Sequence, residues 1–527
     1  MSPSPNTLHP FLFAAVYVLY LAAENPGGYA VGDLPLVAAA VLAGVGLVYL
    51  LAWLALRRHD GLLPALLTLL AVLFCFGLPQ LTQAFPGGLR NPWTIAIAIA
   101  ALAAGGLAVR WLARRPGSLR SVSTLLTLTG TLLVLRFAVD IVADQRFSRR
   151  IVARSDLARE LARPIPGPAS APAPRRDVYL LVLDEYANAE VLRERFGFDN
   201  GAFEDSLRAL GFHIPAAVGS NYFHTILSLP SLLNAAHVHR AAEELPEGVA
   251  DPALVNRLLD RSRVAAYLKA RGYRYVFFPS LWWKSTRSAP LADSVVQVWP
   301  GFHPVRAASR TEFRRVVQEG SVLRYLTRRG PLDADHLRRT LGAFEELPSV
   351  EGPVFAFAHV LSPHSPYVLD PECGVPTGVA AAHRKEGYIG QLRCLNTMLL
   401  DVVTRLLRES DVAPVILLQG DHGTSTLRYS ESPSADRVPA DASRERFGAF
   451  GAYYLPDSGE VAFGDTVTVV NVLGNVLRHY LGADLPREPD DRYLSLEGSA
   501  YDFHRAIEPP PGDTARASSP RRLRRGT

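Results

Sequence analysis

Ionisable side chains are nearly absent from the apolar runs that fill the first 145 residues of this 527-residue chain. A transporter needs polar groups inside its membrane segments, so their scarcity argues against that class. A helix of about 20 apolar residues crosses a bilayer and satisfies its own backbone, so the runs predict a domain of five transmembrane helices over residues 1–144. The runs are Phe11–Ala23, Leu36–Leu56, Leu62–Leu78, Trp93–Val109 and Val122–Val139.

The first and fifth runs leave alternatives open. The first is short enough to be the core of a signal peptide, but residues 1–10 contain no Lys or Arg to form the charged segment that precedes such a core. This absence favours retention in the membrane. Arg136 and Asp140 are four residues apart near the outer end of the fifth run, where an ion pair makes them tolerable. A functional intramembrane site is the other interpretation of that pair.

Arginines in the short loops predict the orientation of the helices. Cytoplasmic loops of membrane proteins are enriched in Lys and Arg. The first and third loops carry only Arg90, whereas the second and fourth carry six arginines: Arg57, Arg58, Arg110, Arg114, Arg115 and Arg120. We therefore expect a multi-pass protein with a cytoplasmic N-terminus and an extracytoplasmic chain after Val139.

The composition changes after residue 144. Residues 145–163 look helical and basic, as an interfacial helix would, and the Pro and Ala stretch from Arg163 to Arg176 favours an extended linker, so residues 145–176 form a connector. Residues 508–527 lack apolar periodicity and are expected to be disordered.

Short β-rich runs alternate with amphipathic helical stretches from Asp177 onward. The runs are apolar on both faces, which predicts an α/β domain with a mostly parallel central sheet over residues 177–507. The expected strands are residues 178–183, 273–278, 354–360, 414–419 and 450–455.

Polar residues directly follow two of these expected strands. Asp184 and Glu185 follow the first strand, and Asp421 and His422 follow the fourth. Active sites of such sheets gather at the carboxyl ends of the strands, and buried carboxylates are costly unless a cation satisfies them. The pattern favours a divalent metal site. A helix cap at the aspartate and a simple turn at residues 421–423 are the alternatives.

The segment GSNYFHTILSLPSLLN, residues 219–234, places Thr225 where a helix could begin. A hydroxyl in that position can cap the helix. It can also be a nucleophile, because a metal lowers its pKa and a helix N-terminus stabilises an anionic group. The residues leave both roles open, with Ser228 and Ser231 as rival hydroxyls.

Two histidines lie in FAFAHVLSPHSPY, residues 355–367. His359 is inside the expected strand, where a lone histidine is interpreted as a core residue. His364 stands in a Pro-rich loop beyond the strand and is the better candidate for contacting a substrate oxyanion.

Cysteine is rare, with three residues in the chain. Cys75 lies in the third apolar run and is interpreted as a small buried apolar residue. Cys373 and Cys394 lie in the half predicted to be outside the cytoplasm, where disulfides persist. Their spacing fits a turn-rich loop tied back to a helix that begins near Tyr388, so we predict a disulfide, with two unrelated thiols as the alternative.

The order of these motifs resembles the sulfatase-like branch of the alkaline phosphatase superfamily, particularly the lipoteichoic acid synthases and phosphoethanolamine transferases. Those bacterial enzymes of the cytoplasmic (inner) membrane also carry about five membrane helices before an exported catalytic domain. The resemblance implies an alkaline phosphatase-like fold for the α/β domain. The matching pieces are VYLLVLDEY, SNYFHTILSLPSLLN, FAHVLSPHSPY, YIGQLRCLNTMLLDVVTRLL and VILLQGDHG.

The resemblance also implies roles for individual residues. Asp184, Asp421 and His422 would be ligands of a divalent Mn, Zn or Mg ion. Thr225 would be the nucleophile and a further ligand, and His364 would bind substrate. Two departures matter: Asp184 stands where those synthases use Glu, and the chain lacks the Cys-x-Pro-x-Arg signature of authentic sulfatases, which disfavours sulfate-ester hydrolysis.

The implied reaction is a double displacement through a covalent phospho-threonine, which water or an acceptor hydroxyl resolves. Membrane lipids would be the donor and an envelope glycan or lipid the acceptor, and no nucleic-acid partner is expected. A phosphodiesterase or sulfuric ester hydrolase of the same superfamily is the first alternative. A non-catalytic membrane protein on this fold is the second.

The arginine distribution predicts the outcome of a reporter experiment. An enzyme that is active only outside the cytoplasm should be active when fused after Arg176 and silent when fused after Arg115. Reporter activity is compared at equal fusion levels in whole cells. The reverse pattern would place the α/β domain in the cytoplasm.

Overall fold

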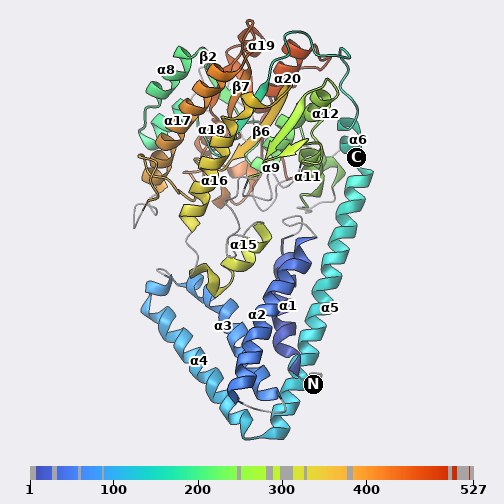
Figure 1. The fold of residues 1–527 in the computed structure, drawn as a ribbon, viewed down its shortest axis with the longest axis vertical. Coiled ribbons are helices and arrows are strands. Elements are labelled where there is room, and N and C mark those ends of the chain that lie inside the picture. The colour runs from blue at the N-terminus through green and yellow to red at the C-terminus, as the bar shows by residue number, and fades with distance from the viewer. Residues whose placement is uncertain are drawn as a thin grey trace. The chain divides into compact units, whose positions relative to one another are not determined.

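The computed structural model describes residues 7–25, 32–56, 61–85, 88–245, 251–280, 289–296, 312–325, 329–376, 384–496, 501–506 and 521–522 (Figure 1). Contacts divide the chain into two compact units. The first comprises Met1–Ser148 and Gly301–Arg328, and the second Arg149–Pro300 and Arg329–Thr527. Residues 301–328 thus group with the N-terminal helices, although the sequence predicts them inside a continuous domain over residues 177–507.

The N-terminal apolar runs are helices. Four of them are long and apolar enough to cross a membrane: α2 (Asp33–Leu56), α3 (Leu62–Ala84), α4 (Pro92–Ala113) and α5 (Pro116–Arg154). The first run is the shorter helix α1 (His9–Ala23), which has 15 residues. The total of five spans and the cytoplasmic N-terminus stay predictions. The Arg136–Asp140 ion pair is present, with 3.5 Å between Nε and Oδ2.

A segment that interrupts the α/β domain in sequence packs within the first unit. It forms helix α15 (Glu312–Glu319) and the 3₁₀ turn η4 (Val322–Tyr325). Phe313 and Val317 of α15 are buried against apolar side chains of α1 and α2. Next to them, the Tyr17 hydroxyl of α1 donates a hydrogen bond to the Gly320 carbonyl over 2.8 Å.

The second unit is built on a seven-stranded sheet with strand order β2-β8-β7-β1-β6-β4-β5. Its five strands from β7 to β5 are parallel, whereas at one edge β8 pairs antiparallel with β7 and β2 pairs antiparallel with β8. The prediction of a mostly parallel sheet is confirmed. The strands are β1 (Val178–Leu183), β2 (Phe212–His213), β4 (Arg274–Phe278), β5 (Ser294–Val295), β6 (Val354–Val360), β7 (Val415–Gly420) and β8 (Gly451–Tyr454).

Alternating residues of β1 enter the two cores on either side of the sheet. Tyr179, Leu181 and Leu183 pack on the side of α8, α16 and α17. Val178, Leu180 and Val182 pack on the side of α9, α12 and α20. Because both faces are covered, no position of this strand is polar. The helices are α8 (Gly201–Ala209), α9 (Thr225–Asn234), α12 (Arg263–Lys269), α16 (Arg329–Phe344), α17 (Arg384–Glu409) and α20 (Val469–Leu481) (Figure 1).

Shorter elements complete the second unit. The helices are α6 (Asp156–Leu161), α7 (Ala189–Val191), α10 (Ala241–Glu244), α11 (Ala253–Asp260), α18 (Ala440–Phe447) and α19 (Glu460–Phe463). The helical turns are η3 (Leu192–Phe196), η5 (Leu347–Ser349), η7 (Tyr429–Glu431) and η8 (Ala435–Arg437). Two small sheets pair β3 (Ala217–Gly219) with β9 (Thr466–Thr468), and β10 (Tyr493–Leu494) with β11 (His504–Arg505) and β12 (Arg521–Arg522).

The expected connector is partly packed. Residues 145–154 continue α5, and Ser155 caps α6 by accepting a hydrogen bond from the Ala158 amide over 2.9 Å. In the Pro and Ala stretch that follows, Ile165 and Ala171 are buried in a core of the second unit. Of the tail predicted to be disordered, residues 508–520 and 523–527 lie outside the described residues, whereas β12 pairs with β11.

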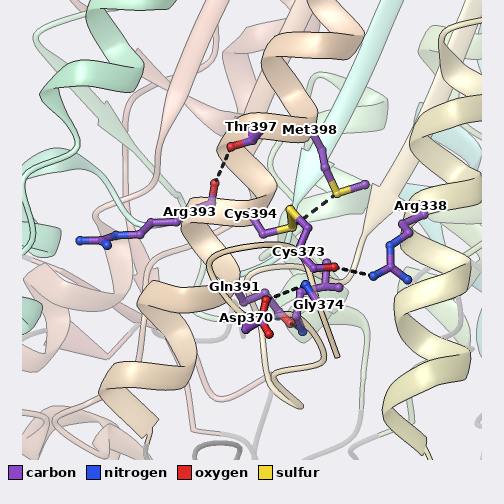
Figure 2. The surroundings of a disulfide bond; sticks show 10 residues. Arg338, Asp370, Cys373, Gly374, Gln391, Arg393, Cys394, Thr397 and Met398 are labelled. Atoms are coloured by element: carbon purple, nitrogen blue, oxygen red, sulfur yellow. Dashed lines mark hydrogen bonds between the residues drawn. A yellow bond between two sulfur atoms is a disulfide. The ribbon is translucent and has the colours of Figure 1, made fainter. Parts of the chain in front are cut away.

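The predicted disulfide joins Cys373 and Cys394 (Figure 2). Cys394 is fully buried in α17, and Cys373 lies in the loop that follows β6. The side chain of Arg338, from α16, donates a hydrogen bond to the Cys373 carbonyl over 2.6 Å. The bridge therefore ties this loop to the helix layer. The free cysteine, Cys75, is half-buried in α3.

Closing this loop restricts the unfolded chain. A loop of about 20 residues contributes roughly 3 kcal/mol to the free energy of unfolding. We expect the double variant Cys373→Ser/Cys394→Ser to lose about that much in urea unfolding of the full chain. Reduction of the wild-type protein should give a similar loss, and Cys75→Ser is the control with no loss. Two alkylated cysteines in unreduced protein from its native envelope would contradict the bridge.

Candidate metal centre and active site

The carboxyl ends of two neighbouring strands bring three predicted ligands together. β1 and β7 are parallel, and Leu183 pairs with Gly420, so the next residues, Asp184 and Asp421, leave the sheet side by side. His422 follows directly. One ligand atom from each of these three residues lies within 4.8 Å of the others, and all three side chains are buried. The sequence predicts this convergence correctly because the register of adjacent parallel strands fixes it.

Burial makes the charged forms of the side chains in this cluster unfavourable. Desolvation raises the pKa of Asp184 well above its usual range, and the adjacent Glu185 carboxylate raises it further. Desolvation also raises the pKa of Asp421, with Asp184 as the second cause. The pKa of His422 is lowered, first by burial and then by the positive charge of Arg446. Two repelling carboxylates beside a neutral imidazole are the ligand chemistry of a divalent cation.

The hydrogen bonds of the cluster leave metal-ligand atoms available. Asp421 Oδ1 accepts from the backbone amides of Glu185 and His422, at 3.1 and 2.9 Å. Asp184 Oδ1 is buried and has no hydrogen-bond partner among the described residues. The Nδ1 atom of His422 lies 3.1 Å from the Gly423 carbonyl, which leaves Nε2 facing the carboxylates. A buried oxygen without a hydrogen-bond partner among the described residues, next to these other ligand atoms, is suited to bind a metal ion.

Thr225 is the predicted hydroxyl that reaches this cluster. It is the first residue of α9, its side chain is buried, and its Oγ1 lies 2.9 Å from His422 Nε2. The rival Ser228 is 3.1 Å from the Ser220 hydroxyl, and Ser231 donates to the Ser228 carbonyl inside the helix. Since the two serines bond within their own segment, the structure places Thr225 alone of the three against the ligands.

His364 is joined to the cluster through its backbone. Its amide donates to the Asp184 carbonyl over 3.1 Å, and its side chain is half-buried. The charge that it would carry when protonated disfavours protonation of His422 and of His359. The loop thus brings the His364 imidazole close enough to His422 and His359 for its charge to act on both.

His359 is at the cluster and not simply in the core. Its Nε2 lies 3.6 Å from Asp184 Oδ2. Desolvation, followed by the influence of His364, lowers its pKa to about 3. The interpretation of His359 as an ordinary core residue is therefore incomplete, because the last residues of β6 run beside the end of β1.

Two further residues of the centre are not among the predicted site residues. Glu185 has a left-handed backbone, with φ of 60°, and its carboxylate accepts from Arg446 Nη1 over 2.8 Å. The buried guanidinium of Arg446 also lies 3.1 Å from His422 Nε2 and donates to the Phe223 and Gly423 carbonyls. Arg446 is the penultimate residue of α18, five residues before β8, and belongs to no recognisable motif, so only the tertiary structure reveals it.

Comparisons with known proteins give similarity to solved structures alone. No family model matches the sequence, and no curated protein matches it. The C-terminal periplasmic domain of EcEptC from Escherichia coli, in a complex with Zn, is similar at 11% identity over 63% of this chain and 93% of that one, with a TM-score of 0.43.

Two further solved structures are similar over comparable lengths. Lipooligosaccharide phosphoethanolamine transferase A (EptA) from Neisseria meningitidis matches at 13% identity over 88% of this chain and 94% of that one, with a TM-score of 0.40. A protein of the alkaline phosphatase superfamily from Vibrio parahaemolyticus matches at 13% identity over 64% and 76%, with a TM-score of 0.39. At these scores the likeness assigns neither substrate nor reaction to this chain.

Proposed function

We propose that this chain is a membrane-anchored, metal-dependent enzyme that transfers or hydrolyses a phosphate-linked group through a covalent intermediate on Thr225. The observation that carries the proposal is the contact between the Thr225 hydroxyl and His422, within a buried cluster of two aspartates and a histidine. A hydroxyl held among ligand atoms at the start of a helix is placed for nucleophilic attack on an anionic ester.

Each residue of the cluster has its own proposed role. Asp184, Asp421, His422 and the Thr225 oxygen would hold the ion. A bound divalent cation lowers the pKa of a hydroxyl and offsets negative charge on phosphate oxygens. The N-terminus of α9 directs backbone N–H groups toward an anion beside Thr225.

The reaction proceeds in two displacements. In the first, the Thr225 oxygen forms a bond to phosphorus, its proton is released, and the bond to the leaving alcohol breaks with protonation of that oxygen. In the second, water or an acceptor hydroxyl attacks the phospho-threonine, and the Thr225 oxygen takes a proton back. His364, half-buried beside the ligands, would contact the non-bridging oxygens in both steps.

The membrane helices suggest the substrate class. Four apolar helices precede the α/β unit in the chain, so the enzyme would meet lipid headgroups as donors and envelope glycans or lipids as acceptors on the extracytoplasmic face of the bacterial inner membrane. The competing candidate is a phosphodiesterase, which would use the same ligands with water as acceptor. Lipid analysis of membranes with and without the protein separates the two, since a transferase moves a headgroup to an acceptor and a hydrolase releases it.

Removing the nucleophile should abolish turnover while the protein stays folded. Thr225→Ala deletes a hydroxyl and one methyl group, so we expect loss of activity on phosphodiester substrates to background. The wild-type enzyme, quenched during turnover, should carry a phosphate-linked adduct on the Thr225 peptide by mass spectrometry. Ser228→Ala is the matched control and should retain activity. An adduct on Ser228 or Ser231 would contradict the assignment.

Removing a ligand should release the metal. Asp421→Asn keeps the shape of the side chain but replaces an anionic ligand by a weaker neutral one. We expect the purified variant to lose most of its bound metal and its activity, measured by elemental analysis and by titration with Zn²⁺ and Mn²⁺. Asp177→Asn, at the other end of β1, is the control. Undiminished metal content in Asp421→Asn would remove Asp421 from the site.

A further inference from the structure

We infer that Gln391 is the positioning residue that holds His364 against the candidate active site, an inference that rests on the proposed function. Gln391 lies in α17 and its side chain is fully buried. Its Nε2 donates a hydrogen bond to the His364 carbonyl over 3.0 Å. Its Oε1 accepts from the amides of Val368 and Leu369, at 2.6 and 3.3 Å. The Gln391 side chain therefore bonds to the loop at His364 and again further along the chain, at Val368 and Leu369.

The backbone of His364 is fixed on both sides. Its amide donates to the Asp184 carbonyl, and its carbonyl accepts from Gln391. Because these two bonds fix the peptide groups around its Cα, they set the direction in which the imidazole leaves the chain. Pro363 and Pro366 have no N–H to donate, so the loop depends on partners from other elements.

The same side of α17 holds other parts of the site. Tyr388, Gln391 and Cys394 follow at three-residue intervals, so each neighbours the next on the helix surface, and all three side chains are buried. The Tyr388 hydroxyl donates to the Glu185 carbonyl over 2.8 Å. Cys394 forms the disulfide to the loop, and Gln391 lies one turn before it, beside the segment of Asp370 and Gly374 (Figure 2). The helix thus supports both the loop after β1 and the loop after β6.

The side-chain amide of Gln391 is needed to make all three of these hydrogen bonds. Glutamate would accept from Val368 and Leu369 but, when ionised, could not donate to the His364 carbonyl. Methionine has a similar length and would make none of the three bonds. Gln391→Glu, when ionised, therefore removes the bond to His364 and adds a negative charge, whereas Gln391→Met removes the whole clamp with little change in volume.

The experiment uses the full chain in detergent, loaded with Zn²⁺ or Mn²⁺, and bis(4-nitrophenyl) phosphate as the probe. We expect kcat to fall about 10-fold to 100-fold in Gln391→Met and Gln391→Glu, as a small misplacement of a catalytic group can cost. KM and metal content should change little. In the double variant with His364→Ala, Gln391→Met should cause no further loss, because a positioning residue acts only through the group that it positions.

Asp177→Ala is the matched control. It also removes buried hydrogen bonds, from the Val354 amide at 2.7 Å and the Tyr179 hydroxyl at 2.7 Å, but at the opposite end of β1 and about 20 Å along the strand from the ligands. It should lower Tm as Gln391→Met does and keep kcat. Equal loss of kcat in both variants would show a general effect of stability and would overturn the proposal.

Hydrogen exchange gives a readout that does not depend on activity. The amides of Val368 and Leu369 should exchange faster in Gln391→Met but not in Asp177→Ala. Wild-type exchange and wild-type kcat in Gln391→Met would overturn the proposal, as would losses that multiply in the double variant. If the wild-type protein shows no turnover of the probe, the proposed function fails, and the exchange rates still decide whether Gln391 clamps the loop.

Discussion

Asp184 and Asp421 share one buried volume because β1 and β7 are hydrogen-bonded parallel neighbours that end at the same edge of the sheet. Both side chains are buried, each with 1% of its surface exposed. Their repulsion and desolvation would be unfavourable without compensating charge. The arrangement of the site follows from this constraint, since nearby elements supply hydrogen-bond donors, a cationic side chain and a further candidate ligand atom.

Three elements that are far apart in sequence contribute contacts around the two aspartates and the neighbouring loops. Arg446 places its guanidinium between Glu185 and His422. The start of α9 brings the Thr225 hydroxyl. Helix α17 supports the loops from behind, through Tyr388 and Gln391. The loop after His422 is held separately, since Glu445 is buried and accepts from the hydroxyls of Thr424 and Thr426 at 2.7 and 2.9 Å. The strands fix the ligands, and these contacts fix the loops around them.

Sequence reasoning reaches the strands and the polar residues that follow them, but not the residues that support the surrounding loops. VYLLVL and VILLQG are buried on both faces, so their apolar runs mark them as central strands and the residues that follow as site candidates. Gln391 and Arg446 leave no such signal, because their roles depend on which loops the fold brings to them. Helix α15 could not be assigned either. Its partners in α1 and α2 are about 300 residues away, and no short-range pattern records that packing.

The ionisable groups buried at the centre also indicate what charge a bound cation would need to carry. Asp184, Glu185 and Asp421 are three carboxylates, and all are buried. Arg446 contributes one positive charge, and its hydrogen bond to the Glu185 carboxylate pairs that charge with Glu185. Burial and the positive charge of Arg446 lower the pKa of His422 and so disfavour its protonated, charged form. The two aspartates remain, and when both are ionised one divalent cation would balance their two negative charges. The Glu185–Arg446 pair therefore adds no net charge, and the two aspartates are the groups that a divalent cation would compensate.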